Sequence, residues 1–157
     1  MRLKSWLSLV ALLLAGHGVW ATSDPIAHLL ARDTAPPGVV FEIVSVDGDY
    51  LETTLPLAHD AARRLRDRFP GLDVVIVSHG REQFALLSSA ADESPQVHAK
   101  VRSLLADDVR LHVCGTHASW YGHTPEDFPD YVDVAEAGPA QINDYRALGY
   151  ELVVLDP

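Results

Sequence analysis

The sequence predicts an α/β protein in which a mainly parallel sheet lies between two layers of helices. Short runs of β-branched and other apolar residues, each of strand length, recur along the chain. Between them lie segments whose apolar residues are spaced three and four positions apart, as in amphipathic helices. Strands that alternate with helices are joined by right-handed crossovers, which place helices on both faces of a parallel sheet.

Five segments are predicted to form this sheet. The second of them, Asp73 to Ser78, is almost continuously apolar, which is typical of a strand buried on both faces of a parallel sheet. The five predicted strands are residues 39–44, 73–78, 109–114, 132–134 and 150–155.

The helix boundaries follow from caps and breakers. Because proline is tolerated best in the first turn, Pro56 predicts a helix that begins near Thr53 or Thr54 and ends before Pro70. Ser94 is a typical cap for a second helix that begins with proline. A last helix is expected to begin near Gly138, and its inward-facing residues are predicted to be Ile142, Tyr145 and Leu148.

The N-terminus has the three-part order of a secretory signal peptide. Arg2 and Lys4 precede an apolar run at residues 6–15, and Val19 and Ala21 occupy the two positions that a signal peptidase reads. A membrane-spanning helix needs about 20 apolar residues, roughly twice the length of this run, so we expect cleavage after Ala21 rather than a retained anchor. The protein is therefore expected to be exported, and to be periplasmic or secreted.

The rest of the chain is expected to form one domain. Residues 1–21 are the predicted signal peptide, 22–38 an extended lead-in that contains prolines, and 39–157 the α/β domain. The formal net charge of −10 becomes about −12 when the two cations of the leader are removed. Because such a field repels phosphate backbones and anionic headgroups, we expect neither nucleic acid nor, after cleavage, a membrane as a partner.

The candidate site centres on the one cysteine of the chain, at the end of the third predicted strand. In an open parallel sheet, ligands bind beyond the carboxyl ends of the strands, which places residues 45–49, 78–80 and 114–117 at one edge. Cys114 has no partner for an intramolecular disulfide, and the glycine after it favours backbone amides close to the sulfur, which would stabilise a thiolate. We expect this sulfur to be open to solvent.

Histidines near this cysteine leave two further interpretations open. A thiolate with two or three imidazoles suits Zn²⁺ or Cu⁺, so Cys114 with His117, His123 or His79 forms a candidate metal site. Alternatively, Cys114 is inert and the chain is a non-catalytic subunit of an oligomeric assembly. In that case the polar face of the third strand, which carries Arg110 and Cys114, would meet another subunit.

Several segments together resemble the DsrE/DsrF-like family from Val39 to the C-terminus. These are VVFEIVS, LDVVIVSHG, VRLHVCG, EDFPDYVDV and LGYELVVLDP. The resemblance implies a three-layer α/β/α domain with a five-stranded, mainly parallel sheet, assembled as a homo-oligomer or with related subunits. It also implies that Cys114 carries sulfur as a persulfide without a cofactor, exchanging it with a protein donor or acceptor.

Sulfur handling is therefore the function that the sequence favours. In this interpretation His79 and His117 are polar neighbours that could tune the reactivity of Cys114. In the family, the cysteine often begins a C-x-N-T pattern. In this chain Thr116 stands in place of the asparagine and His117 in place of the threonine.

Overall fold

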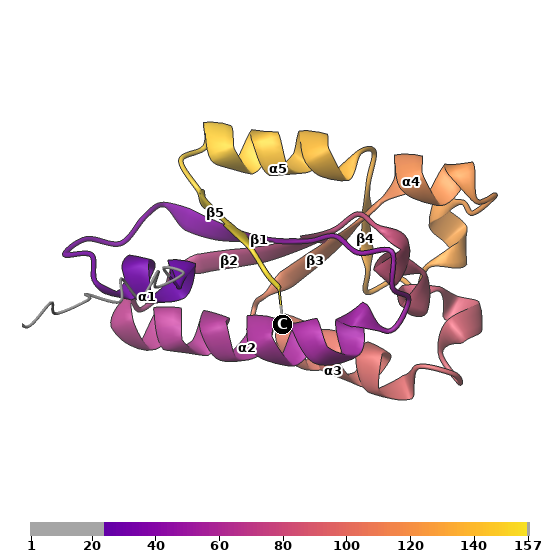
Figure 1. Ribbon diagram of the computed structural model, residues 1–157, viewed down its shortest axis with the longest axis horizontal. Coiled ribbons are helices and arrows are strands. Elements are labelled where there is room, and N and C mark those ends of the chain that lie inside the picture. The colour runs from indigo at the N-terminus through magenta and orange to yellow at the C-terminus, as the bar shows by residue number, and fades with distance from the viewer. Residues whose placement is uncertain (1–23, 157) are drawn as a thin grey trace, which may run out of the picture.

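The structure is a computed structural model that describes residues 24–156 (Figure 1). The predicted signal peptide, residues 1–21, lies outside the described residues. Within the described range, no helix has both the length and the apolar character needed to cross a membrane.

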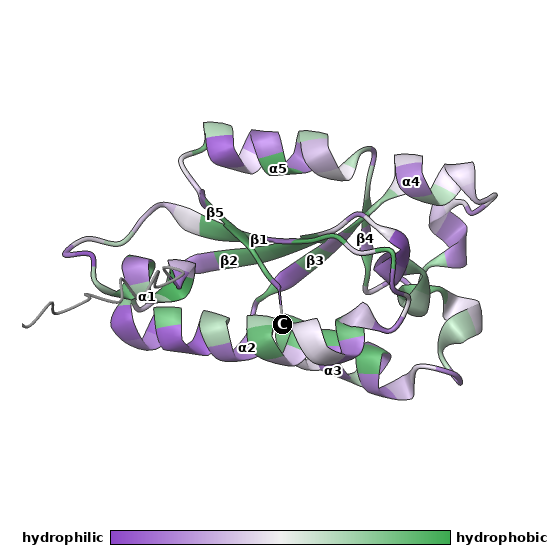
Figure 2. Ribbon diagram, in the orientation of Figure 1, coloured by the Kyte–Doolittle hydropathy of each residue, from purple (hydrophilic) through white to green (hydrophobic). Residues whose placement is uncertain are grey.

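The predicted fold class is confirmed: a five-stranded parallel sheet lies between helices (Figure 1). The strands stand in the order β4-β3-β2-β1-β5, and each is parallel to its neighbours. The central strands are largely green, and therefore hydrophobic, in Figure 2, as expected for strands that are covered on both faces. The strands are β1 (Gly38–Ile43), β2 (Asp73–Ser78), β3 (Arg110–Cys114), β4 (Asp133–Ala135) and β5 (Glu151–Val154).

Helices cover the sheet unequally on its two sides. Helices α2 and α3 lie along one face, whereas α5 lies on the other, with α4 beside it at the carboxyl end of the strands (Figure 1). The α-helices are α1 (Pro25–Leu30), α2 (Tyr50–Arg68), α3 (Pro95–Ala106), α4 (Gly115–Trp120) and α5 (Gly138–Ala147). Shorter 3₁₀ turns are η1 (Arg81–Leu86), η2 (Ser88–Ala90) and η3 (Pro125–Asp127).

This asymmetry divides the core into a large and a small part. Because side chains alternate along a strand, Phe41 and Ile43 of β1 enter the large core under α2 and α3, whereas Val40 enters the small core under α5. The small core is completed mainly by Val75, Val77, Ile142 and Tyr145. The polar side chains of Glu42, Arg110 and His112 lie on the same face of the sheet as this smaller core.

The polar side chains on one face of β3 find their hydrogen-bond partners within the chain. His112 Nε2 lies 2.8 Å from the hydroxyl of Tyr145 on α5, and Arg110 donates to Asp73 at 2.8 Å. Burial lowers the pKa of His112, and the nearby Asp133 carboxylate opposes that shift. These polar side chains on β3 thus serve packing between the sheet and α5.

Two boundary predictions are wrong for identifiable reasons. The expected extended lead-in, 22–38, contains α1, which Asp24 caps by accepting a hydrogen bond from the backbone N–H of Ile26 at 2.9 Å. Helix α2 begins at Tyr50 rather than at Thr53 or Thr54, so Pro56 lies inside it. The early start buries Leu51 and lets the Tyr50 hydroxyl donate to Asp156 at 2.8 Å.

The last helix also differs from its prediction in one residue. Ile142 and Tyr145 are buried as expected, but Leu148 is 68% exposed. Helix α5 ends at Ala147, and Leu148 is its C-cap, so the helical period that would turn this side chain inward stops before it.

One ionisable group of the sheet predicts a pH dependence of stability. The Tyr150 hydroxyl donates to Asp73. Burial, together with this carboxylate, raises the pKa of Tyr150 to about 12. Since a tyrosine in the unfolded chain ionises at about pH 10, the contribution of the neutral phenol is fully present below that pH and is lost as the pH rises through about 12.

We expect Tyr150→Phe to lower the free energy of unfolding by about 1 kcal/mol at neutral pH, because one hydrogen bond is lost. The variant should then lose less stability than the wild type at more alkaline pH, as measured by urea denaturation. Tyr121→Phe is the matched control, since this hydroxyl forms no hydrogen bond within residues 24–156. Equal alkaline losses in Tyr150→Phe and the wild type would contradict the assignment.

Candidate functional site

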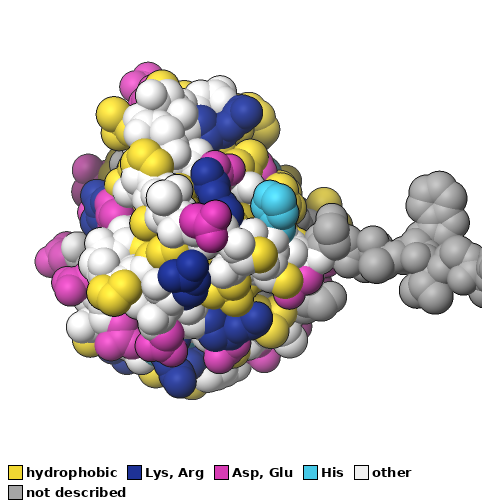
Figure 3. Space-filling model, turned by 90° about the vertical axis from the view of Figure 1, so that its left-hand side faces the viewer, with side chains coloured by type: hydrophobic (Ala, Val, Ile, Leu, Met, Phe, Trp, Pro, Cys, Tyr) yellow, Lys and Arg dark blue, Asp and Glu magenta, His cyan; other side chains and the backbone are white. Residues whose placement is uncertain are grey.

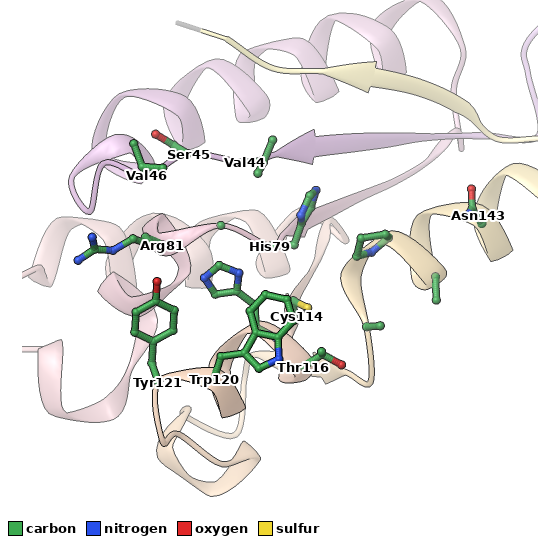
Figure 4. Close-up of a pocket in the computed structure, with 15 residues that line it drawn as sticks. Val44, Ser45, Val46, His79, Arg81, Cys114, Thr116, Trp120, Tyr121 and Asn143 are labelled. Carbon is green, nitrogen blue, oxygen red and sulfur yellow. Dashed lines mark hydrogen bonds between the residues drawn. The ribbon is translucent and has the colours of Figure 1, made fainter.

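A pocket of about 870 Å³ opens at the carboxyl ends of β1, β2 and β3 (Figure 4). This is the edge of the sheet at which the sequence predicts a site. Its wall is built from four segments of the chain: the loop after β1, the loop after β2, the β3–α4 segment and the start of α5. The lining residues are Val44, Ser45, Val46, His79, Gly80, Arg81, Cys114, Thr116, His117, Trp120, Tyr121, Ala137, Pro139, Ala140 and Asn143.

Cys114 lines the pocket but is not open to solvent. It is the last residue of β3 and is only 4% exposed, so the expectation of a freely accessible sulfur is wrong. The chain turns directly into α4 after this residue, and the N–H of His117 in that helix donates to the sulfur at 3.3 Å. The predicted amide near the sulfur is therefore present.

Two of the predicted histidines share the pocket with this cysteine. His79 Nε2 lies 2.7 Å from Glu42 Oε1, which fixes the ring against the end of β1. The ring of His117 stacks on Tyr121 with 5.3 Å between centroids, and its Nε2 is buried and has no hydrogen-bond partner among the described residues. Neither imidazole forms a hydrogen bond with the sulfur within residues 24–156.

The third predicted histidine lies elsewhere. His123 does not line the pocket, and its ring lies 5.3 Å from that of Phe84, with Nδ1 3.7 Å from a carboxylate oxygen of Asp127. Within the described part of the chain, no group of three or more His, Cys, Asp or Glu side chains is arranged to hold a metal ion. The four candidate ligands are thus not gathered at one point.

Glu82 holds the two loops of the pocket together, and the sequence analysis missed it. Its carboxylate is fully buried and accepts three hydrogen bonds: from the N–H of Ser45 at 2.7 Å, the hydroxyl of Ser78 at 2.8 Å and the N–H of Gly80 at 2.9 Å. These hydrogen bonds offset the free-energy cost of removing a carboxylate from water. The carboxylate thereby joins the ends of β1 and β2, although no local pattern in the sequence signals it.

Glycines allow the close approaches around this carboxylate and around the cysteine. A Cβ at position 80 would lie 2.4 Å from the carbonyl oxygen of Ser45, which no backbone can accommodate without a shift. A Cβ at Gly138 would lie 2.6 Å from that of His79 and 3.3 Å from that of Cys114. The first turn of α5 therefore packs directly against two of the predicted site residues.

A second missed residue positions the cysteine backbone. Gln83 is fully buried, and its Oε1 accepts a hydrogen bond from the N–H of Cys114 at 2.7 Å. Its amide nitrogen has no partner among the described residues. Glu82 and Gln83 are neighbours in η1, so this one turn fixes the ends of three strands.

These features define a class: an open parallel α/β sheet with a largely apolar pocket at its carboxyl edge, into which a single cysteine is built. No family model matches the chain, and no curated protein matches it either. Solved structures, in contrast, include proteins with a similar fold.

Two solved structures share the fold over 74% of this chain. MTH1491 from Methanobacterium thermoautotrophicum, described as a protein of unknown function, is 21% identical with a TM-score of 0.59 and is covered over 96% of its length. The ychN protein from E. coli is 16% identical with a TM-score of 0.55 and is covered over 98%. Both have the DsrE/DsrF-like fold that the sequence resemblance predicts; at these identities the likeness extends to the fold alone.

The role of the buried carboxylate can be tested by an isosteric change. Glu82→Gln puts an amide NH₂ where an oxygen now accepts a hydrogen bond, which leaves donors facing each other. We expect a loss of about 2–3 kcal/mol in the free energy of unfolding, as measured by urea denaturation. The matched control is Glu93→Gln, an exposed residue in the turn before α3, which should be neutral. A loss no larger than that of the control would contradict the proposed role of Glu82.

Proposed function

We propose that the protein handles sulfur, with Cys114 as the residue that accepts a sulfane sulfur and passes it on. The observation that carries this proposal is the position of the sulfur: it lines an apolar pocket at the carboxyl edge of the sheet and receives a backbone N–H. An N–H directed at a sulfur favours the thiolate, which is the nucleophilic form of cysteine. The resemblance to the DsrE/DsrF-like family points to the same residue.

The proposed transfer needs no cofactor and is balanced in atoms and charge. The Cys114 thiolate attacks the outer sulfur of a persulfide donor, R–S–SH. The donor S–S bond breaks, R–S⁻ leaves with the electron pair, and the cysteine becomes Cys–S–SH. Reversal of the same step toward an acceptor thiolate passes the sulfur on, with no net oxidation or reduction.

The surroundings of the sulfur support such a role in two ways. Because Cys114 is 4% exposed, a donor must reach it through the pocket, and the burial protects the sulfur from oxidants in bulk solvent. His117 lines the same pocket and its Nε2 has no hydrogen-bond partner among the described residues, so this ring would take the proton that the Cys114 thiol gives up when the attacking thiolate forms.

The proposal predicts that the reduced protein takes up one sulfur atom from glutathione persulfide, as measured by intact-mass spectrometry. Cys114→Ser should take up none. His117→Phe, which keeps an aromatic ring next to Tyr121, should slow loading about tenfold or more, because a proton-holding group is lost. The matched control is His28→Ala, an exposed histidine of α1, which should load like the wild type.

Two outcomes would contradict this function. A thiol that glutathione persulfide does not modify in the native protein, but that a thiol reagent labels after denaturation, would favour the non-catalytic subunit. Stoichiometric Zn²⁺ or Cu⁺ in the purified protein, lost in Cys114→Ser, would favour the metal-binding module.

We further propose that the protein acts after export, with a protein donor or acceptor of sulfur in the same compartment. The support is the signal-peptide pattern of residues 1–21, together with the absence of a second cysteine that could trap Cys114 in an internal disulfide. The exported protein should begin at Thr22, as measured by N-terminal sequencing of a periplasmic or culture-fluid fraction. A full-length chain that stays in the cytoplasm would contradict export.

A further inference from the structure

Exposed apolar side chains gather at the mouth of the pocket. Large hydrophobic side chains are mostly buried in this protein, yet four exposed ones line the same pocket: Val44 at 47%, Val46 at 84%, Trp120 at 73% and Tyr121 at 51%. They come from the loop after β1 and from the end of α4, on opposite walls (Figure 4). An apolar cluster of this kind, concentrated around a cavity, is typical of a binding site.

The charge of the side chains that line this pocket differs from that of the whole chain, although the carboxylates of Glu42 and Glu82 lie behind the wall. The formal net charge is −10, but among residues 24–156 no Asp or Glu lines the pocket and Arg81 is its one Lys or Arg. Among the ion pairs formed within residues 24–156, none includes Arg81, and its guanidinium carbon lies 5.9 Å from the centre of the Tyr121 ring. At the other end of the molecule, where α1 lies, acidic and basic side chains are interspersed (Figure 3).

We propose that this pocket binds a small organic anion with an apolar, preferably aromatic, body. The body would lie against Trp120 and Tyr121, and the negative group would pair with Arg81. This inference rests on the proposed function, because a thiol or persulfide of this class would bring its sulfur to Cys114. A volume of about 870 Å³ suits a small molecule, since such sites range over about 300–1,000 Å³.

Charge complementarity favours this occupant over a second copy of the chain. Two exported copies, each of net charge about −12, repel each other strongly, whereas a small anion carries little charge and can pair with Arg81, which forms no ion pair within residues 24–156. The flat rings on α4 offer the stacking surface that a small aromatic body needs.

A pair of dyes tests the inference on the full chain. The anion 8-anilinonaphthalene-1-sulfonate and the uncharged N-phenyl-1-naphthylamine share their ring system and differ in the sulfonate. In a chain carrying Trp6→Phe and Trp20→Phe, Trp120 is the one remaining tryptophan, so quenching of its emission reports binding at the pocket. We expect both dyes to quench Trp120 saturably, and the anion to bind more tightly.

Arg81→Gln should weaken binding of the anion about tenfold and leave the uncharged dye unaffected. Arg102→Gln, an exposed arginine of α3 outside the pocket, is the matched control and should bind both dyes like the parent chain. Equal loss for both dyes in Arg81→Gln, or no saturable quenching by the anion, would overturn the inference. A sedimenting dimer that Val46→Ser dissociates, with quenching of Trp120 by the dyes appearing only in that variant, would assign the mouth to a second copy instead.

Cys114→Ser separates this inference from the proposed function. The variant should keep the tighter binding of the anionic dye while losing uptake of sulfur. Dye binding without sulfur uptake in the wild type would leave the anion pocket intact and remove the sulfur role. Sulfur uptake without dye binding would leave the sulfur role intact and remove the anion pocket.

Discussion

The buried carboxylate of Glu82 is the interaction on which the geometry of the site depends. The loops after β1 and β2 leave the sheet at its carboxyl edge and form part of the wall of the pocket. By accepting from Ser45, Ser78 and Gly80, this one side chain fixes both loops relative to the strands. Its neighbour Gln83 extends the same turn to the backbone of Cys114. Two buried side chains of η1 thus position two walls of the pocket and the backbone of the cysteine.

Much of the fold could be predicted because each strand has a clear pattern of apolar residues in its own short segment of the sequence. A continuous apolar run such as the one within Asp73–Ser78 is typical of a strand buried on both faces of a parallel sheet, and Ser94 followed by proline begins α3 where expected. Helix α1 was missed because six residues are too few to show a helical period. The position of Pro56 misled because burial of Leu51 and the hydrogen bond of Tyr50 outweigh a local preference about where a helix begins.

The sequence predicted where the candidate site lies, but not all of the residues that build it or how they are covered. The rule that ligands bind at the carboxyl edge of a parallel sheet correctly brought His79, Cys114 and His117 to one pocket. It could not show that α4 and the first turn of α5 cover the sulfur, since Gly138 acts through contacts with residues distant in sequence. Glu82 was missed for the same reason: two of its three partners are backbone groups, which leave no trace in the pattern of side chains.

The unequal division of the core has a consequence for access to the sulfur. Helix α5 rests on a small set of apolar side chains, whereas α2 and α3 share the large core. Because α5 covers fewer apolar side chains than the layer of α2 and α3, less apolar surface is exposed when it moves away from the sheet. Its first turn packs close to Cys114 at Gly138 and also lines the pocket, so the packing of α5 on this small core helps to set how wide the route to the sulfur is.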